Sequence, residues 1–360
     1  MASRSWRRRA HALSAPFAAL VVSLAVAACS ASVTPAPPAP TVAPATAAPT
    51  AAPATPAPTN APTPAPTPTV APAFPVTLTD DEGTTVTLAT RPERIVSLTP
   101  AVTETLFALG AGDRLVANTD FDDYPAEVTK LPHVASYTGV DVEKVVGMKP
   151  DLVIAGGNGF NPPDDIAKLR SVGIPVVVVY ADSVDGILRD VGLVGNATGE
   201  GAAAAALTAW MRERIAAISA AATAASTRPR VFYELDATKE IYGPAPKSFI
   251  AAMIGLAGGQ AITTDDPAVF SIPLEKLVAA DPQVIVLGDA AYGTTPEAVA
   301  QRPGWGSMTA VKDGAIRAVD DTIVTRPGPR IVDGLRALAL AIDPGASLPA
   351  VGTPPPLPVK

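Results

Sequence analysis

One phrase occurs twice in this sequence, and the repetition limits the folds that the chain can adopt. The first copy is VEKVVGMKPDLVIAGG, residues 142–157, and the second is LEKLVAADPQVIVLGD, residues 274–289. Each copy has Glu-Lys after one apolar residue, a proline seven positions after the glutamate, and then a short apolar run. A short helix followed by a buried strand accounts for this order. We therefore expect two lobes built to one plan.

Strands and helices alternate around both copies, after an initial hairpin whose turn is at residues 80–83. The apolar runs are rich in β-branched residues and barely alternate, as strands do when helices cover both faces of a parallel sheet. The expected strands are residues 94–98, 113–118, 151–156, 175–180, 230–235, 283–289 and 315–319. The expected helices are residues 102–110, 142–148, 164–173, 248–259, 274–280, 295–301 and 328–342.

An alanine-rich segment, residues 200–226, separates the two series and predicts one long helix, because alanine is the best helix former. Its larger apolar residues fall on one stripe, formed by Leu207, Trp210, Met211, Ile215 and Ile218. The sequence thus predicts an α/β protein in which this helix bridges two α/β lobes, each with a mostly parallel central sheet. We expect a ligand cleft between the lobes. The expected boundaries are 74–199 for the first lobe, 227–345 for the second and 346–360 for a loose tail.

The first 28 residues have the composition of an export signal, with four arginines followed by an apolar run that is short for a membrane span. The run ends in VAAC, which contains Cys29, the only cysteine of the chain. This segment resembles a bacterial lipoprotein signal, which implies cleavage before Cys29 and lipid attached to it. An incidental free thiol is the alternative, although an unpaired cysteine is unusual in an exported protein. The resemblance implies a protein anchored to the outer face of the cell membrane.

Residues 29–73 contain no charge between Ser30 and Pro72 and consist mainly of proline, alanine and threonine. Such a composition cannot bury enough apolar surface to fold, and proline favours extended conformations. We interpret the segment as a disordered tether, and a glycosylated or wall-spanning stalk is compatible with it. Removal of the signal takes away four arginines and no acid, so the net charge moves from −7 to −11. This charge argues against a nucleic-acid partner.

Enzyme signatures are missing from the sequence. It has no nucleotide-phosphate loop, no zinc-protease helix and no Gly-x-Ser-x-Gly motif. His133 is the only histidine that follows the signal, which excludes a histidine-rich metal site. Acidic pairs such as Asp80 and Asp81 lie beside turns, and a solvated turn explains them better than catalysis does. We expect neither an enzyme nor a resident metal or cofactor.

Aromatic residues follow several of the expected strands, at the positions where ligands bind in open α/β sheets. A cleft lined by aromatic residues with a few polar groups suits a large, flat or partly apolar ligand. The candidate ligand-binding residues are Phe121, Tyr124, Tyr137, Phe160, Tyr242, Tyr292 and Arg326. Tyr180 and Tyr233 are the aromatic residues that we expect to fill the core. Arg326 can pair with an anionic group of the ligand or with an acid of the protein, whereas for Arg330 we favour a structural role.

With these motifs in order, the chain resembles the substrate-binding proteins of cobalamin and ferric-siderophore ABC importers. The resemblance covers about residues 74–342 and rests on RIVSLTPAVTETLFALG, DYP, VEKVVGMKPDLVIA, RVFYEL, LEKLVAADPQVIVL and RPGPRIVDGL. It implies a monomer that closes only slightly on its ligand and delivers it to a permease dimer with its ATPase. In this family one surface glutamate on each lobe docks onto the permease, and Glu143 and Glu275 match those positions. Two solvated helix faces are the alternative interpretation.

The resemblance also bears on the ligand. The family's pocket positions correspond to Phe121, Tyr137 and Gly156, and DYP with Glu127 and Arg326 favours cobalamin or a related corrinoid. Ferric siderophores follow closely, and haem is third. A surface lipoprotein that senses a ligand without a transport partner is the alternative from another functional class.

Overall fold

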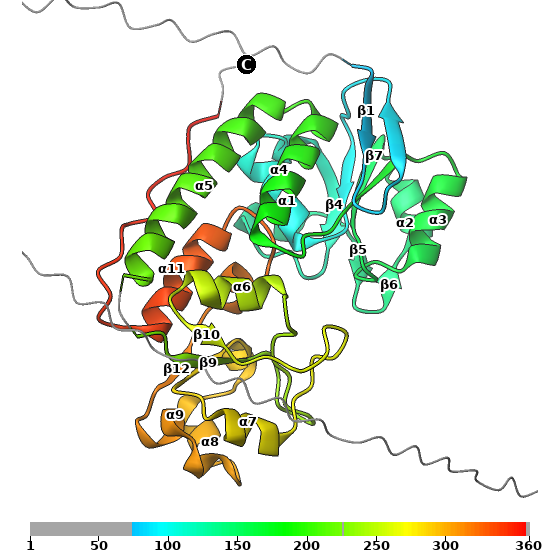
Figure 1. Ribbon diagram of the computed structural model, residues 1–360. Helices are drawn as coiled ribbons and strands as arrows, with labels where there is room; N and C mark the ends of the chain where they lie inside the picture. The colour runs from blue at the N-terminus through cyan, green and yellow to red at the C-terminus, as the bar shows by residue number, and fades with distance from the viewer. Residues whose placement is uncertain (1–73, 225–226, 358–360) are drawn as a thin grey trace, which may run out of the picture. The chain divides into compact units, whose positions relative to one another are not determined.

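A six-stranded sheet forms the centre of the first lobe in the computed structural model, which describes residues 74–224 and 227–357 (Figure 1). The strand order is β6-β5-β4-β3-β7-β8, and every neighbouring pair is parallel except β5 with β6. Its strands are β3 (Ile95–Ser97), β4 (Leu115–Thr119), β5 (His133–Ser136), β6 (Gly139–Val140), β7 (Leu152–Gly156) and β8 (Val176–Val179). A separate antiparallel hairpin, β1 (Val76–Thr79) with β2 (Thr85–Leu88), precedes this sheet as expected.

The second lobe has a four-stranded sheet in the order β10-β9-β11-β12, and all of its neighbouring pairs are parallel. Its strands are β9 (Arg230–Glu234), β10 (Gln260–Ala261), β11 (Val284–Leu287) and β12 (Ile316–Ala318). The predicted α/β fold with two lobes and mostly parallel sheets is therefore confirmed. The short strands β5, β6 and β10 were not expected from the sequence.

The repeated phrase occupies equivalent places in the two lobes. Helix α2 (Val142–Gly147) leads into β7, which pairs with the first strand of its sheet, β3. Helix α7 (Leu274–Ala280) leads into β11, which pairs in the same way with β9. After each helix, the residue directly before the proline has a positive φ, Lys149 in one lobe and Asp281 in the other. The two lobes thus share one local plan, as the repetition predicts.

The remaining helices cover both faces of the two sheets (Figure 1). They are α1 (Pro100–Ala108), α3 (Pro163–Ser171), α4 (Val184–Thr198), α6 (Phe249–Leu256), α8 (Pro296–Ala300), α9 (Thr309–Lys312), α10 (Asp321–Val324) and α11 (Ile331–Ile342). Short 3-10 turns occur at η1 (Gly112–Arg114), η2 (Ala126–Lys130), η3 (Asp289–Tyr292) and η4 (Trp305–Ser307).

Helix α4 was missed by the sequence analysis, which left residues 181–199 without an element. Its signals are nevertheless present. Ser183 caps its N-terminus by accepting from the Gly186 backbone N–H, and Gly199 ends it with a left-handed conformation. Apolar residues at helical spacing, beginning with Ile187 and Leu188, face the core.

The long helix is α5 (Gly201–Ala222), which begins one residue later than expected. The predicted stripe is buried at Leu207, Met211, Ile215 and Ile218. Trp210 is only partly buried and packs against the same core. Its predicted last residues, 225 and 226, lie outside the described part of the chain.

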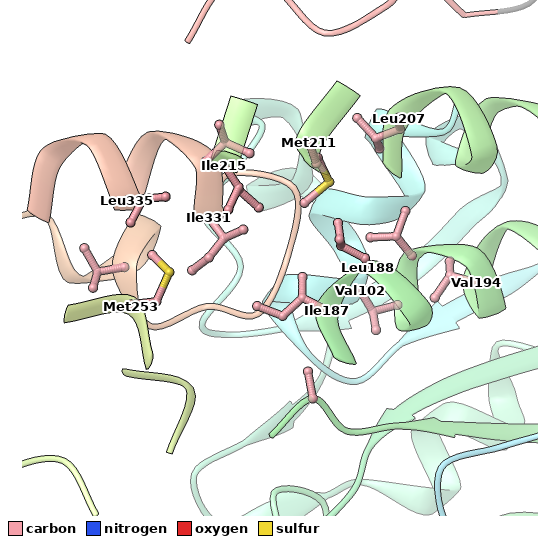
Figure 2. Close-up of a cluster of buried hydrophobic side chains, with 14 of the residues drawn as sticks. Val102, Ile187, Leu188, Val194, Leu207, Met211, Ile215, Met253, Ile331 and Leu335 are labelled. Carbon is pink, nitrogen blue, oxygen red and sulfur yellow. The ribbon is translucent and has the colours of Figure 1, made fainter. Parts of the chain in front are cut away.

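One apolar cluster connects the two lobes through α5. Figure 2 shows side chains from α1, α4 and α5 facing those from α6 and α11 in this cluster. The labelled members are Val102, Ile187, Leu188, Val194, Leu207, Met211, Ile215, Met253, Ile331 and Leu335. The cluster also includes strand residues of both sheets, such as Ile154 of β7 and Val286 of β11. The bridging helix is therefore part of a core that belongs to both lobes.

The C-terminal tail forms no helix or strand between residues 346 and 357, yet it is held against the body rather than being loose. Leu348 and Val351 pack against the shared apolar cluster. The Arg336 side chain also donates a hydrogen bond to the Pro349 carbonyl oxygen at 3.1 Å.

Several expectations fall outside the described residues, namely the export signal, the lipid-bearing Cys29 and the tether at 29–73. Among the residues described, no helix combines the length and the apolar character that a membrane crossing requires.

We predict that Gly195→Ala destabilises the protein, because a Cβ atom at Gly195 would overlap the Ala204 side chain where α4 meets α5. Overpacking of this kind costs about 1–3 kcal/mol of unfolding free energy. Gly192→Ala in the same helix is the matched control, since a Cβ atom there meets nothing within 4 Å. We expect this control to be neutral or stabilising by about 0.5–1 kcal/mol. Urea denaturation measures both, and equal stability of the two variants would contradict the predicted contact.

Candidate functional site

A cleft of about 660 Å³ lies between the two lobes. The first lobe contributes the segments that follow β3, β7 and β8, where Thr99, Gly157 and Tyr180 line the cleft. The second lobe contributes Phe249 and Tyr292. Ligands of open α/β sheets bind beyond the carboxyl ends of the strands, and the strand-end segments of the first lobe lie in this cleft.

Four of the predicted site residues line this cleft, namely Phe121, Phe160, Tyr292 and Arg326. Tyr137 lines an adjoining hollow of about 310 Å³, which shares Phe121 and Phe160 with the cleft. Tyr137 and Tyr292 are 87% and 88% exposed, so their rings are accessible to a partner or ligand.

Two predicted residues line neither space. Tyr124 lies under the Arg330 guanidinium, which is 4.3 Å from the centre of its ring. Tyr242 belongs to an irregular bridge between Asp236 and Ser271 in the second lobe. The structure therefore brings together five of the seven predicted residues around connected hollows and leaves these two outside.

The absence of a side chain at Gly156 leaves room for the aromatic ring that forms this wall of the cleft. A Cβ atom at Gly156 would lie 2.8 Å from the Thr99 methyl group and 2.9 Å from a ring carbon of Phe160. A side chain at Gly156 would therefore displace the Phe160 ring, so this residue positions an aromatic wall rather than supplying one.

Tyr180 was expected to fill the core, and this expectation is wrong. Its side chain is 42% exposed, lines the cleft and accepts a hydrogen bond of 2.9 Å from the Asn158 side-chain amide. Tyr233 is completely buried, as predicted. The two tyrosines differ because Tyr180 follows the last residue of β8, whereas Tyr233 lies within β9. The sequence analysis also missed Asn158 and Phe249 as cleft residues.

A cluster of four charged residues joins the lobes beside the cleft. Glu104 of α1 is buried and accepts hydrogen bonds from Arg330 at 2.6 and 2.8 Å and from Arg326 at 3.1 Å. Arg326 also donates to both Asp123 oxygens, at 2.5 and 3.1 Å, and these contacts hold the pKa of the Asp123 carboxyl below its usual range. The structural role expected for Arg330 is confirmed, and Arg326 pairs with acids of the protein.

A second acidic group lies at the wall of the cleft. Burial raises the pKa of Asp190 to about 8, helped by the neighbouring carboxyl of Asp81. Asp81 belongs to the β1–β2 turn, and it accepts from the Tyr180 backbone N–H at 2.7 Å. Arg189 pairs with both carboxyls, at 3.2 Å from Asp81 and 3.4 Å from Asp190. At neutral pH Asp190 is therefore mostly uncharged.

The acidic residues of the β1–β2 turn were expected to be solvated, and the structure contradicts this expectation. Asp80 is buried, and one of its oxygens accepts a hydrogen bond of 2.8 Å from Arg170. Its other oxygen accepts from the backbone N–H groups of Glu82 and Thr84. The turn is anchored in this way against the end of β8, where Tyr180 enters the cleft.

Asp321 lines the second lobe's part of the cleft. It accepts hydrogen bonds of 2.9 Å from the Tyr233 and Thr325 hydroxyl groups, and burial raises its pKa above the ordinary value. No group of His, Cys, Asp and Glu within residues 74–224 and 227–357 is arranged to hold a metal ion. The arrangement suits binding of a ligand with a broad apolar surface.

We predict that Asp190 makes stability depend on pH. Its pKa is raised from 3.8 to about 8 on folding, so its protonated form stabilises the folded state below about pH 4 and this stabilisation is lost as pH rises towards and past 8. The loss is at most about 1.4 kcal/mol per pH unit. The charged neighbours facing it are Asp81, Arg189 and Asp182. Asp190→Asn keeps the side chain neutral at every pH. Denaturation between pH 5 and 9 should therefore show an unfolding free energy that depends less on pH in the variant than in the wild type. Parallel profiles would contradict the assignment.

Comparison with known proteins is consistent with this cleft. Residues 95–322 match the periplasmic binding protein family. A cobalamin-binding protein of Halobacterium salinarum is 37% identical over 279 residues, which cover 75% of this chain and 74% of the relative. An uncharacterized ABC transporter substrate-binding lipoprotein of Bacillus subtilis, YvrC, is 34% identical over 275 residues, covering 75% of this chain and 86% of the relative.

Two solved structures share the fold. The vitamin B12-binding protein BtuF of Vibrio cholerae superposes with a TM-score of 0.61 and 28% identity, covering 70% of this chain and 96% of BtuF. The haem-binding protein RhuT of Roseiflexus also gives a TM-score of 0.61 and 28% identity, covering 69% of this chain and 97% of RhuT. With two lobes, a bridging helix and an interlobe cleft in place, the chain belongs to the periplasmic binding protein family.

Proposed function

We propose that the protein captures a metal chelate, with cobalamin or a related corrinoid favoured, and delivers it to an ABC permease. The observation that carries this proposal is the cleft between the lobes, whose walls present Phe121 and Phe160 from one lobe and Tyr292 from the other. Aromatic rings on both walls suit a flat macrocycle that stacks between them. The relatives that bind cobalamin or vitamin B12 support this ligand class.

The charges around the cleft favour a corrinoid over haem. Among the described residues that line the cleft, the acids are Asp190, which is mostly uncharged at neutral pH, and Asp321. Arg326 is the only cation among them, and it is already paired with Glu104 and Asp123. Haem carries two carboxylates, which would meet acids and no uncommitted cation. A corrinoid carries amide groups around its ring, which can donate hydrogen bonds to Asp321 and accept them from hydroxyl groups. Buried polar groups need such partners.

Haem or a ferric siderophore is the second candidate. The exposed phenol groups of Tyr137 and Tyr292 favour it, because a phenol oxygen is a ligand for ferric iron. The haem-binding protein RhuT gives this candidate the same structural support that BtuF gives the first.

We predict that Phe160→Ala and Tyr292→Ala each weaken cyanocobalamin binding by about 1–3 kcal/mol, because each removes a ring from one wall of the cleft. Val172→Ala is the control, since Val172 is an exposed apolar residue at the end of α3 that lines neither hollow. Isothermal titration calorimetry measures the affinities. Unchanged affinity in both aromatic variants would place the ligand elsewhere.

The docking function proposed for Glu143 and Glu275 is supported by their positions. Both are exposed, and each lies in the first turn of its helix, α2 in one lobe and α7 in the other. Neither forms an ion pair within the part of the chain that the structure describes. A permease built as a homodimer offers the same basic pocket twice, and two equivalent glutamates match that symmetry.

We predict that Glu143→Lys combined with Glu275→Lys abolishes uptake and leaves ligand affinity unchanged, because neither side chain lines the cleft. The measurements are uptake of labelled cobalamin by cells and binding by the purified variant. A matched control is Glu213→Lys with Glu297→Lys, which reverses two exposed charges on other helices. Normal uptake in the first double variant would refute docking through these glutamates.

The mode of attachment completes the proposal. Lipid on Cys29 and a tether at residues 29–73 would keep the binding lobes close to the outer face of the membrane, and the lipoprotein relative YvrC supports this arrangement. A sensing lipoprotein without a transport partner remains the alternative class. The double variant at Glu143 and Glu275 separates the two, because a sensor would keep its function.

A further inference from the structure

Both arginines beside the cleft are held by one buried carboxylate. We propose that Glu104 determines ligand charge selectivity. By pairing with Arg326 and Arg330 it leaves no free positive charge among the described residues that line the cleft, which therefore prefers amide-bearing ligands over carboxylate-bearing ones. The inference rests on the proposed function and adds a residue that acts through its partners without lining the cleft.

The position of Glu104 fits this role. It lies on α1, whose residues Ala101, Val102 and Thr105 line the cleft, while its own side chain is only 2% exposed. Both carboxylate oxygens of Glu104 accept hydrogen bonds from arginines of the second lobe. Oε1 accepts from Arg330 Nη2 at 2.6 Å and from Arg326 Nη1 at 3.1 Å, and Oε2 accepts from Arg330 Nε at 2.8 Å.

The charges of the cluster cancel. Asp123 is the second carboxylate, and with Glu104 it balances the two arginines. The Arg330 guanidinium also stacks over the ring of Tyr124. Arg326 is the only cationic residue among the described residues that line the cleft, and the acid Asp321 lines the same cleft. A ligand carboxylate would thus lose its hydration without gaining a cation, which is unfavourable.

Removal of the Glu104 charge reverses this balance. Glu104→Gln keeps the shape and one acceptor oxygen, so one arginine can keep its hydrogen bond. The cluster then carries one excess positive charge next to the cleft. A ligand carboxylate gains a charge-assisted partner in Arg326, whereas an amide gains little.

The test compares two ligands of nearly identical size, cyanocobalamin and its monocarboxylate, in which one side-chain amide is hydrolysed. Calorimetry on the full chain in detergent gives the ratio of their affinities. The wild-type protein should prefer the amide form, and Glu104→Gln should shift the ratio about tenfold towards the carboxylate. High salt should reduce this shift. Asp123→Asn should shift the ratio in the same direction. Because the Asp123 side chain is 56% exposed, this variant provides the test if Glu104→Gln does not fold.

A purely structural role predicts a different result, because it would weaken both ligands equally and leave the ratio unchanged. That outcome in both variants would overturn the proposal. Asp313→Asn is the control, since it removes one acidic charge from an exposed residue that precedes β12 and does not line the cleft, and it should not move the ratio. If the wild-type protein binds haemin but no corrinoid, the proposal of a corrinoid ligand is wrong, and the role of Glu104 is tested separately. Haemin and its dimethyl ester then form the matched pair, and an unmoved ratio again refutes the role of Glu104. If no chelate binds, the inference falls with the proposed function.

Discussion

The cleft depends on the apolar core that runs along α5 and belongs to both lobes. Leu207, Met211, Ile215 and Ile218 form one buried stripe of this helix, and side chains of α4 and α11 pack against the same cluster. Each fully buried aliphatic side chain contributes about 1.5–3 kcal/mol, so separation of the lobes would expose a large part of the stabilising surface. A connection of this kind limits the change in the angle between the lobes. We therefore expect the cleft to be largely formed before a ligand arrives, which would keep the cost of binding low.

Polar groups then fix the loops that the core cannot reach. The carboxylate of Asp80 ties the first hairpin to the end of β8, and Asp81 positions Tyr180 at the cleft. On the other side, Glu104 receives both arginines of the second lobe. Asp80 and Glu104 are buried and paired, and loss of a partner leaves an uncompensated charge, which costs about 3–5 kcal/mol. Segments that carry cleft residues such as Tyr180 and Phe121 are thus held in place by these polar contacts.

Local patterns predicted most of the fold. The β-branched runs, the alanine-rich helix and the repeated phrase are each readable within one segment, because they reflect periodicity and propensity. Helix α4 was not predicted although its cap and apolar spacing are present, because Gly186, Gly192 and Gly195 lower its helix propensity. The aromatic residues after strands were partly predictable in the same way, because the ends of parallel strands meet at one edge of a sheet.

The polar part of the site was not predictable from such patterns. Glu104 and Arg330 are 226 residues apart in the sequence, and nothing near either residue indicates the other. Asp80 looks like a turn residue until its contact with Arg170 is known, and Tyr180 looks like the end of a core strand. Long-range pairs depend on how the lobes pack, so only the three-dimensional structure assigns them.

Titration of the chain lacking residues 1–29 with cyanocobalamin, a ferric hydroxamate and haemin tests the central claim most directly. Calorimetry would give the stoichiometry and affinity for each. The account predicts saturable binding of one cyanocobalamin per chain, tighter than binding of either of the other two ligands. Saturable binding of haemin or the ferric hydroxamate without binding of cyanocobalamin would contradict it.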